Sequence, residues 1–138
     1  MNNQEVMDFI KAHNHCFLGT LDGDQPRVRG VHLYISEKDE LMVHTGKMKD
    51  LYSQLQSAEK VEICCVDFQN MIQVRVSGIS QEEEDLRVKH QIVEERPYLK
   101  PFVEQGSIHG LGVFRITRPK ATVWTMNTNL DKKELITL

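Results

Sequence analysis

Short strand-like segments joined by turns of a few residues constrain the fold of this chain more than any other feature. The segments Cys16–Leu21, Val28–Ile35 and Glu40–Thr45 are rich in β-branched and apolar residues. The first turn is Asp22-Gly23-Asp24, in which glycine tolerates a positive φ, and the second is the polar segment Ser36–Asp39. This spacing predicts three antiparallel strands in a meander, because such short turns return the chain directly alongside itself.

The rest of the chain inserts helices between further strands. Apolar residues at helical spacing predict helices over residues 3–13 and 47–58, and an acidic segment at 81–85 predicts a third helix that ends at Pro97. A short helical turn is expected over residues 99–103, and further strands over residues 61–66, 71–79, 111–117 and 121–126. We therefore predict one α+β domain over residues 1–138, mainly β, in which about six to seven antiparallel strands form a barrel with small flanking helices.

Composition excludes several classes of function. The 138 residues are 40% hydrophobic and 27% charged, and the net charge of −3 gives no basic surface for nucleic acid. The apolar runs are too short to cross a bilayer, and the N-terminal residues lack the apolar core of a signal peptide. Three cysteines, two of them adjacent, do not indicate a disulfide framework. We expect a cytoplasmic protein, without nucleic-acid or membrane partners, whose small barrel pairs with a second copy to cover an apolar wall.

Strand alternation over residues 27–32 places two arginines on one face. Arg27 and Arg29 point to the same side, whereas Gly30 and His32 point to the other. Two neighbouring guanidinium groups favour an anionic partner, and Gly30 permits another group to approach the backbone closely. A solvated edge strand with ordinary surface arginines is the alternative.

The segment His44–Lys49 joins a strand end to an expected helix start. The Thr45 hydroxyl, free backbone N–H groups and the ammonium groups of Lys47 and Lys49 would converge there, which suits a phosphate. A solvated lysine-rich turn is the alternative. The sequence lacks the GxxxxGK[ST] pattern of a Walker A loop.

No other pattern in the sequence carries chemistry of its own. The histidines lack the i, i+4 spacing of a helical zinc site, although His32 and His44 as cross-strand neighbours would permit haem or metal ligation. Ordinary hydrogen-bonded histidines are the default interpretation, and no metal site is predicted. Cys64 and Cys65 point to opposite strand faces and are interpreted as core or near-core thiols. Because no catalytic side chain can be assigned, we expect a bound cofactor to supply the reactive group.

Three segments together resemble a known family. They are PRVRGVHLY, LMVHTGKMKDLYSQL and KVEICCVDFQNMIQVRVSG, which begin at Pro26, Leu41 and Lys60. In their order and spacing, within residues 3–126, they resemble the pyridoxamine 5′-phosphate oxidase-like family of FMN-binding split barrels. The similarity is greatest to its small single-domain members of the general-stress and nitroimidazole-resistance type. The resemblance implies a split-barrel homodimer with FMN at the subunit interface.

The resemblance also implies which residues contact FMN. The stretch from Arg29 to His32 would line the flavin, and the Arg29 side chain could reach the phosphate. The other phosphate contacts would come from the turn after the third strand. Gln73 would hydrogen-bond the isoalloxazine ring, and Trp124 would cover the ring from the partner subunit. The implied cofactor-binding residues are Arg29, Gly30, Val31, His32, His44, Thr45, Lys47, Lys49, Gln73 and Trp124.

Departures from the family pattern narrow the expected function. The pyridoxamine phosphate oxidases carry a basic residue where Tyr34 stands, and a Ser-Arg-Lys run where this chain has Lys49-Asp50-Leu51. The Asp50 carboxylate would oppose a phosphate there unless it turns outward. We therefore expect an FMN-dependent oxidoreductase that uses a small substrate or a nicotinamide donor and does not oxidise pyridoxamine phosphate. The alternative is a non-catalytic flavin- or haem-binding module for storage or sensing.

Overall fold

The structure, a computed structural model, describes residues 1–57, 59–101 and 108–138. It has the expected α+β, mainly β fold. Within the described residues the helices are α1 (Asn3–Ala12), α2 (Asp50–Ser57), α3 (Leu86–Glu95), η1 (Pro97–Leu99), η2 (Ile108–Gly110) and η3 (Met126–Thr128). The strands are β1 (His15–Asp22), β2 (Gln25–His32), β3 (Tyr34–Ile35), β4 (Leu41–Gly46), β5 (Lys60–Asp67), β6 (Ile72–Glu82), β7 (Leu111–Thr125) and β8 (Ile136–Thr137).

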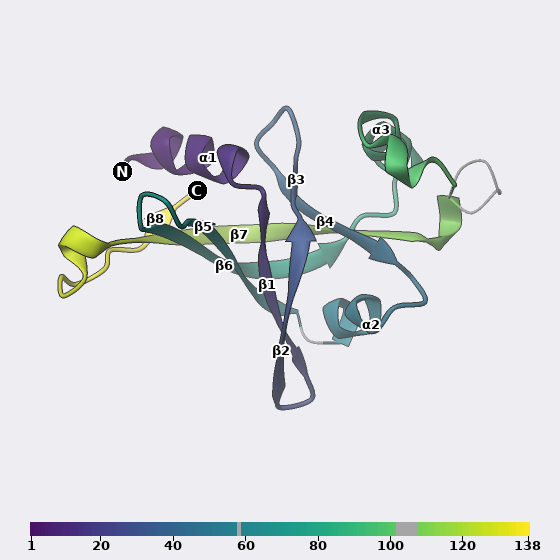
Figure 1. Cartoon of the computed structure of the whole chain (residues 1–138). Coiled ribbons are helices and arrows are strands. Elements are labelled where there is room, and N and C mark those ends of the chain that lie inside the picture. Colours follow the sequence, from purple (N-terminus) through teal and green to yellow (C-terminus); the bar gives the residue numbers. More distant parts are fainter. Residues whose placement is uncertain (58, 102–107) are drawn as a thin grey trace.

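The strands form one antiparallel sheet that curls on itself (Figure 1). The strand order is β2-β1-β5-β6-β7-β4-β3, and β8 pairs with β7. The two outermost strands of this order, β2 and β3, are joined in the chain by Leu33 alone, so the sheet must bend until its edges meet. Among the described strands no backbone ladder joins β2 to β3 or to β4. The fold is therefore a split β-barrel, and we call the unpaired boundary between β2 and the β3–β4 pair the seam.

The predicted meander of three strands is wrong in one respect. The segment expected as a single strand over residues 28–35 breaks at Leu33 into β2 and β3, and β4 pairs with β3 and β7 rather than with β2. Leu33 is fully buried, and its N–H donates to the carbonyl oxygen of Asn14 at 2.8 Å. The chain turns into the core at this residue, and that turn separates the two strands.

The last strand also differs from expectation, because the segments 111–117 and 121–126 belong to one continuous strand, β7. Arg118 adopts a φ of 51° within it, and the register to β6 shifts between Ser77 and Ile79. A side chain at Gly78 would lie 2.5 Å from Ile116 Cγ2, so the irregularity brings the two backbones close together. A β-bulge bends a strand without ending it, which explains why Pro119 does not terminate β7.

The helices begin where local caps place them. The Asn2 side chain accepts from the Glu5 N–H in a capping box, which starts α1 where the sequence predicts it. The acidic segment was expected to begin α3, but its first residues extend β6, and α3 starts only after Asp85, whose side chain accepts from the Arg87 N–H. As predicted, α3 ends before Pro97. The helical turn expected at 99–103 is helical where the structure describes it, since η1 ends at Leu99 and residues 100 and 101 are helical, whereas residues 102 and 103 lie outside the described part.

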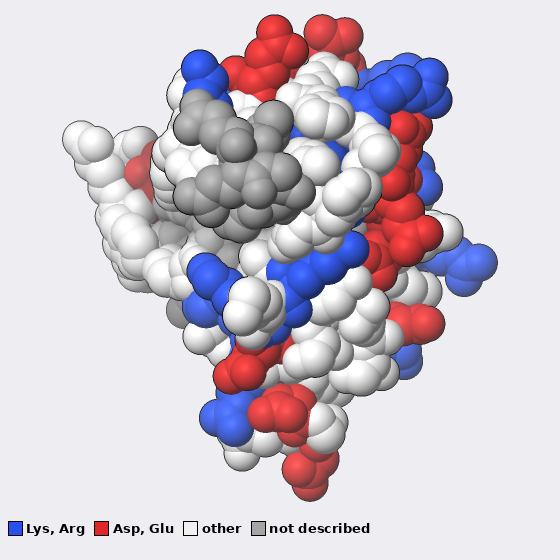
Figure 2. All heavy atoms as spheres, turned by 90° about the vertical axis from the view of Figure 1, so that its right-hand side faces the viewer, with Lys and Arg blue, Asp and Glu red and all other residues white. Residues whose placement is uncertain are grey.

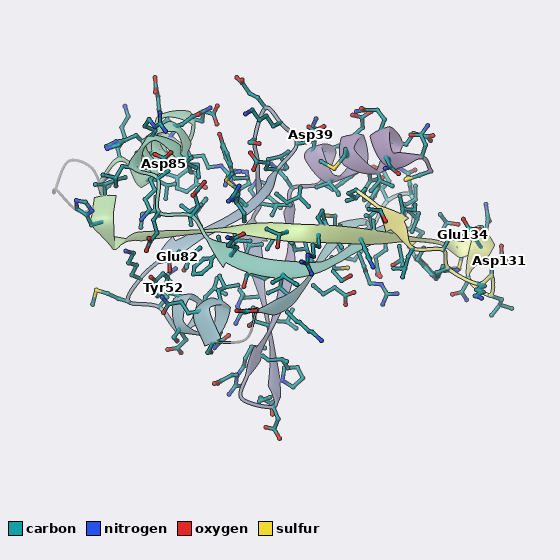
Figure 3. The ribbon with its side chains drawn as sticks, turned by 180° about the vertical axis from the view of Figure 1, so that it is seen from behind. Asp39, Tyr52, Glu82, Asp85, Asp131 and Glu134 are labelled. Carbon is teal, nitrogen blue, oxygen red and sulfur yellow. The ribbon has the colours of Figure 1, made fainter. Side chains whose placement is uncertain are left out.

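Tyr52 anchors α2 to the sheet. Its hydroxyl donates to Glu82 Oε2 at 2.7 Å, and the two side chains lie side by side in Figure 3. Its ring packs over Gly112, where an added Cβ would lie 2.6 Å from the ring. A glycine is therefore required on β7 for α2 to approach the sheet.

Alternate residues of β4 face two different apolar cores. One core joins α1 and α2 to the sheet and includes Val43, and the other packs α3 against β3, β4 and β7 and includes Met42. Because side chains alternate along a strand, His44 lies on the face toward α3 and Thr45 lies on the face toward α2. None of the described helices combines the length and apolar character needed to span a membrane.

Candidate functional site

A cavity of about 830 Å³ lies at the seam, where β2 faces the end of β4. We call it the seam cavity. Its volume is typical of small-molecule sites. Residues of β2, β4, the start of α2 and η1 line it, and seven of the ten predicted cofactor residues are among them: Arg29, Gly30, Val31, His32, His44, Thr45 and Lys49. Figure 2 views the side of the molecule that carries α2 and α3, on which basic and acidic side chains are interspersed.

Arg29 brings to the seam cavity a positive charge that no carboxylate neutralises within the described residues. Its Nη1 donates to Thr20 Oγ1 at 2.7 Å and to the Leu18 carbonyl at 3.3 Å, and its Nη2 donates to Gln54 Oε1 at 2.6 Å. Neutral oxygens therefore hold the guanidinium in place. Burial, together with the charge of Arg27, lowers the pKa of Arg29. A half-buried cation without a counter-ion is suited to bind an anionic ligand.

The turn after β4 separates the two lysines that were expected to act together. The Lys49 N–H donates to the Gly46 carbonyl at 3.0 Å, and α2 begins only at Asp50 rather than at Lys47. The Lys47 Nζ lies 5.9 Å from the centroid of the Tyr52 ring, and Lys47 is not among the residues that line the seam cavity. Lys49 lines the cavity, but so does Asp50. The predicted cradle is therefore one lysine with a carboxylate beside it.

The two histidines of the seam cavity are engaged by hydrogen bonds. His32 Nδ1 lies 3.0 Å from Tyr98 Oη, and its Nε2 lies 3.3 Å from Asn14 Nδ2. His44 Nε2 lies 2.8 Å from Arg96 Nη1. Burial and then the charge of Arg96 lower the pKa of both imidazoles, that of His44 to about 4. At neutral pH both rings are therefore uncharged polar groups of the cavity wall.

Gln73 and Trp124 lie on the outer face of the sheet, away from the seam cavity of their own chain. They are cross-strand partners on β6 and β7, and alternation places them opposite the fully buried Val74. The Trp124 indole N–H donates to Asn129 Oδ1 at 2.7 Å. A single chain does not bring these two residues together with the seven that line the seam cavity.

Arg96 and Tyr98 are the functional candidates that sequence reasoning missed. Both follow α3, more than fifty residues beyond His44 in the chain, and no spacing in the sequence connects them to the seam. The available signal was Pro97, which ends α3 and fixes a tight turn on either side of itself. That turn directs Arg96 to the backbone of the seam and Tyr98 to the seam cavity.

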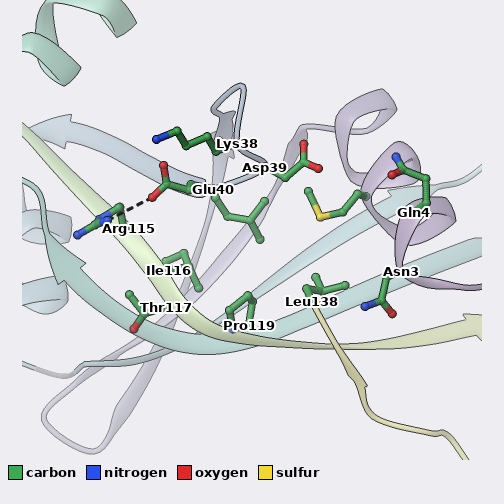
Figure 4. A pocket seen from close by; sticks show the side chains of 12 residues that line it. Asn3, Gln4, Lys38, Asp39, Glu40, Arg115, Ile116, Thr117, Pro119 and Leu138 are labelled. Atoms are coloured by element: carbon green, nitrogen blue, oxygen red, sulfur yellow. Dashed lines mark hydrogen bonds and ion pairs between the residues drawn. The ribbon is translucent and has the colours of Figure 1, made fainter.

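A second cavity, of about 430 Å³, lies between α1, the turn before β4 and β7 (Figure 4). Arg115 Nη1 lies 3.2 Å from Glu40 Oε2, and Asp39 Oδ1 lies 2.6 Å from Lys11 Nζ. These charged groups already have partners, and none of the predicted site residues lines this cavity. The seam cavity is therefore the better candidate for a functional site.

The cysteines are packing residues, as the sequence predicts. Cys65 is fully buried, whereas Cys64, on the other face of β5, is half-buried, and the thiols are free. Burial raises the pKa of the Cys64 thiol, which disfavours the reactive thiolate. Within residues 1–57, 59–101 and 108–138 there is no group of three or more His, Cys, Asp or Glu side chains able to hold a metal ion.

An incompletely closed antiparallel barrel with small flanking helices and a cavity at its seam defines the split-barrel class. The family model described as pyridoxamine 5′-phosphate oxidase matches residues 3–124. The chain therefore belongs to the pyridoxamine 5′-phosphate oxidase family, as the resemblance indicated. No curated protein matches the sequence.

Solved structures of related fold cover nearly the whole chain. A NimC/NimA family protein from Clostridium acetobutylicum is 25% identical with a TM-score of 0.78, over 98% of this chain and 92% of its own. General stress protein 26 from Bacillus anthracis is 17% identical with a TM-score of 0.75, over 98% and 97%. A heme binding protein from Mycobacterium smegmatis is 15% identical with a TM-score of 0.71, over 96% of this chain and 57% of its own. At these identities the last two establish a shared fold.

Proposed function

We propose that this chain binds FMN in the seam cavity, with the phosphate near Arg29, and that it is an FMN-dependent oxidoreductase. The observation that supports this most directly is the Arg29 guanidinium, which lines the cavity and is held by neutral oxygens without a carboxylate partner in the described chain. A phosphate monoester would supply the missing counter-ion. Membership of the pyridoxamine 5′-phosphate oxidase family supports the choice of a phosphorylated ligand.

The residues of the seam cavity fit the phosphate end of such a cofactor. Arg29 and Lys49 carry positive charge, and Thr45 contributes a buried hydroxyl. Leu51 and Leu99 add apolar wall against which a planar ring could pack. When bound, FMN supplies the redox chemistry, while the chain's own residues bind it, orient it and restrict the access of water.

We also propose a homodimer in which each seam cavity is completed by the partner subunit. Gln73 and Trp124 lie on the outer face of the sheet, where only a second copy could bring them to a seam cavity. The side chains of Phe17 and Val28 on the same face are 43% and 71% exposed, which is unfavourable for a monomer in water. Sedimentation at micromolar concentration tests this proposal, because a purely monomeric protein would leave each cavity without these two residues.

A non-catalytic binding module is the second candidate, and haem is the ligand that a specific observation favours. One solved structure of this fold is named as a heme binding protein, and two histidines line the seam cavity. The hydrogen bonds of His32 and His44 disfavour haem, since ligation by either ring nitrogen of His32, or by Nε2 of His44, would displace an existing partner. We therefore rank flavin above haem.

The deciding experiment is a visible spectrum of the purified protein after loading with FMN and desalting, followed by a turnover assay with NADH or NADPH and an artificial electron acceptor. A retained flavin band near one per subunit, with flavin-dependent turnover, supports the oxidoreductase. Retained flavin without turnover would favour the binding module. A protein that stays colourless after loading would refute flavin binding, and a Soret band would redirect the assignment to haem.

A further inference from the structure

Arg96 connects the two sides of the seam. It is the C-cap residue of α3 and is only 7% exposed. Its Nη1 donates to the His32 carbonyl at 2.6 Å, and its Nη2 donates to the Leu33 carbonyl at 2.7 Å. The same Nη1 lies 2.8 Å from Nε2 of His44 on β4. One buried guanidinium therefore joins the end of β2 to the strand across the seam, where no ladder between described strands does so.

The contact with His44 determines where the imidazole carries its proton. A guanidinium has only donor groups, so the nitrogen that faces it must offer a lone pair. His44 Nε2 is therefore unprotonated, and the proton of the neutral ring is on Nδ1. No described residue forms a hydrogen bond with Nδ1, and His44 lines the seam cavity.

The other groups around His44 also favour the neutral imidazole. The ring is largely buried, and the Tyr98 ring on η1 lies with its centroid 6.4 Å from that of His44. The charged or titratable groups that shift the pKa of His44 are Arg96 after α3, His32 on β2 and Lys49 before α2. Burial and each of these groups lower the pKa of His44, which reaches about 4. No carboxylate of the described chain opposes them, so the imidazole stays neutral across the physiological range.

We propose that Arg96 is a positioning residue that fixes His44 as a neutral Nδ1–H donor, so that the seam cavity presents a hydrogen-bond donor of constant charge to an acceptor atom of its ligand. The use of that donor rests on the proposed flavin function, whereas the tautomer itself does not. The ligand atoms that suit such a donor are a phosphate-ester oxygen, a hydroxyl oxygen or a ring carbonyl. His44 would then contribute orientation, and Arg29 and Lys49 would contribute the charge.

The tautomer can be measured in the ligand-free protein by ¹⁵N-histidine NMR as a function of pH. We expect His44 to show the Nδ1–H form with no titration above pH 5. Arg96→Gln should raise its midpoint by one to two pH units and mix the two tautomers. Arg87→Gln is the matched control, because Arg87 is an exposed arginine on the same helix that pairs with Asp85 and does not line the cavity. A wild-type His44 that is protonated on Nε2, or that titrates near pH 6.5, would overturn the proposal even if Arg96→Gln failed to fold.

A second measurement tests the consequence for ligand binding. For Arg96→Gln and for Arg87→Gln, the FMN dissociation constant at pH 5.5 is divided by that at pH 7.5. Comparing the two ratios cancels the contribution from the titration of FMN itself. We expect Arg96→Gln to gain about three- to tenfold in relative affinity at pH 5.5, because a freed His44 becomes cationic there. Equal ratios in the two variants would refute the role in binding. Failure of wild type to bind FMN would refute the proposed function and leave the NMR result to decide the tautomer.

Discussion

Replacing Arg29 by methionine should separate flavin affinity from stability. The substitution removes the guanidinium but keeps most of the side-chain stem. Thr20 Oγ1 already donates to Gln54 Oε1 at 2.7 Å, so these two buried groups keep a partner after the change. The loss of stability should therefore stay near 1 kcal/mol. A hydrogen bond to a charged group contributes about 1.5–3 kcal/mol, which corresponds to a loss of about 10- to 150-fold in FMN affinity.

Flavin fluorescence titrations with FMN and with riboflavin measure this effect, since riboflavin has the same ring system without the phosphate. Arg29→Met should weaken FMN binding and leave riboflavin binding nearly unchanged. Arg27→Met is the matched control, because Arg27 neighbours Arg29 but pairs with Asp22 at 3.3 Å and does not line the seam cavity. If FMN affinity were unchanged in Arg29→Met, or if riboflavin affinity fell by the same factor, the assignment of Arg29 to the phosphate would be wrong.

Further predictions follow from the same geometry. Lys49→Ala should weaken FMN binding by about two- to fivefold, as expected for an exposed charge, whereas Lys47→Ala should change it little, which titration checks. Asp50→Asn should strengthen FMN binding by about two- to fivefold, and this gain should shrink in high salt. Folding lowers the pKa of His44 from 6.5 to about 4, so the unfolded chain binds its proton first as the pH falls. Stability should then be lost between pH 6.5 and 4, by roughly 3 kcal/mol at 1.36 kcal/mol per pH unit, and urea unfolding of His44→Asn should show a flatter profile. Gly112→Ala should destabilise the fold by about 1–3 kcal/mol in the same assay, because the new methyl group would overlap the ring packed on it.

The strands of this fold could be predicted from the sequence because their alternation and turns are local. The prediction that Arg29 and Gly30 point to opposite faces of β2 is confirmed. Arg29 pairs with the buried Leu18, and Gly30 pairs with Phe17 on the outer face. The break at Leu33 could not be predicted, because an apolar residue between His32 and Tyr34 fits a continuous strand equally well. Its turn depends on a bond to Asn14, which a local pattern does not contain.

The candidate site was predictable only where its residues are close in sequence. Most of the cavity residues within Arg29–His32 and His44–Lys49 were predicted because each set lies on one strand or at its end, although Lys47 does not line the cavity. The carboxylate of Asp50 was recognised as unfavourable, but whether it faced the cavity depended on where α2 begins. Arg96 was missed because its role arises from the packing of α3 near the seam, which only the tertiary structure defines.

The single-residue link at Leu33 has a consequence for the order in which the molecule assembles. The strands on either side of that link have their partners elsewhere: β2 pairs with β1, and β4 pairs with β7, some seventy residues further along the chain. The two walls of the cavity are therefore fixed independently, and they can meet only once the C-terminal half has docked. A ligand that spans them would bind the completed barrel and not its precursors. By mass action it would then raise the melting temperature in proportion to the logarithm of its concentration, because it would hold the two walls of the completed barrel together.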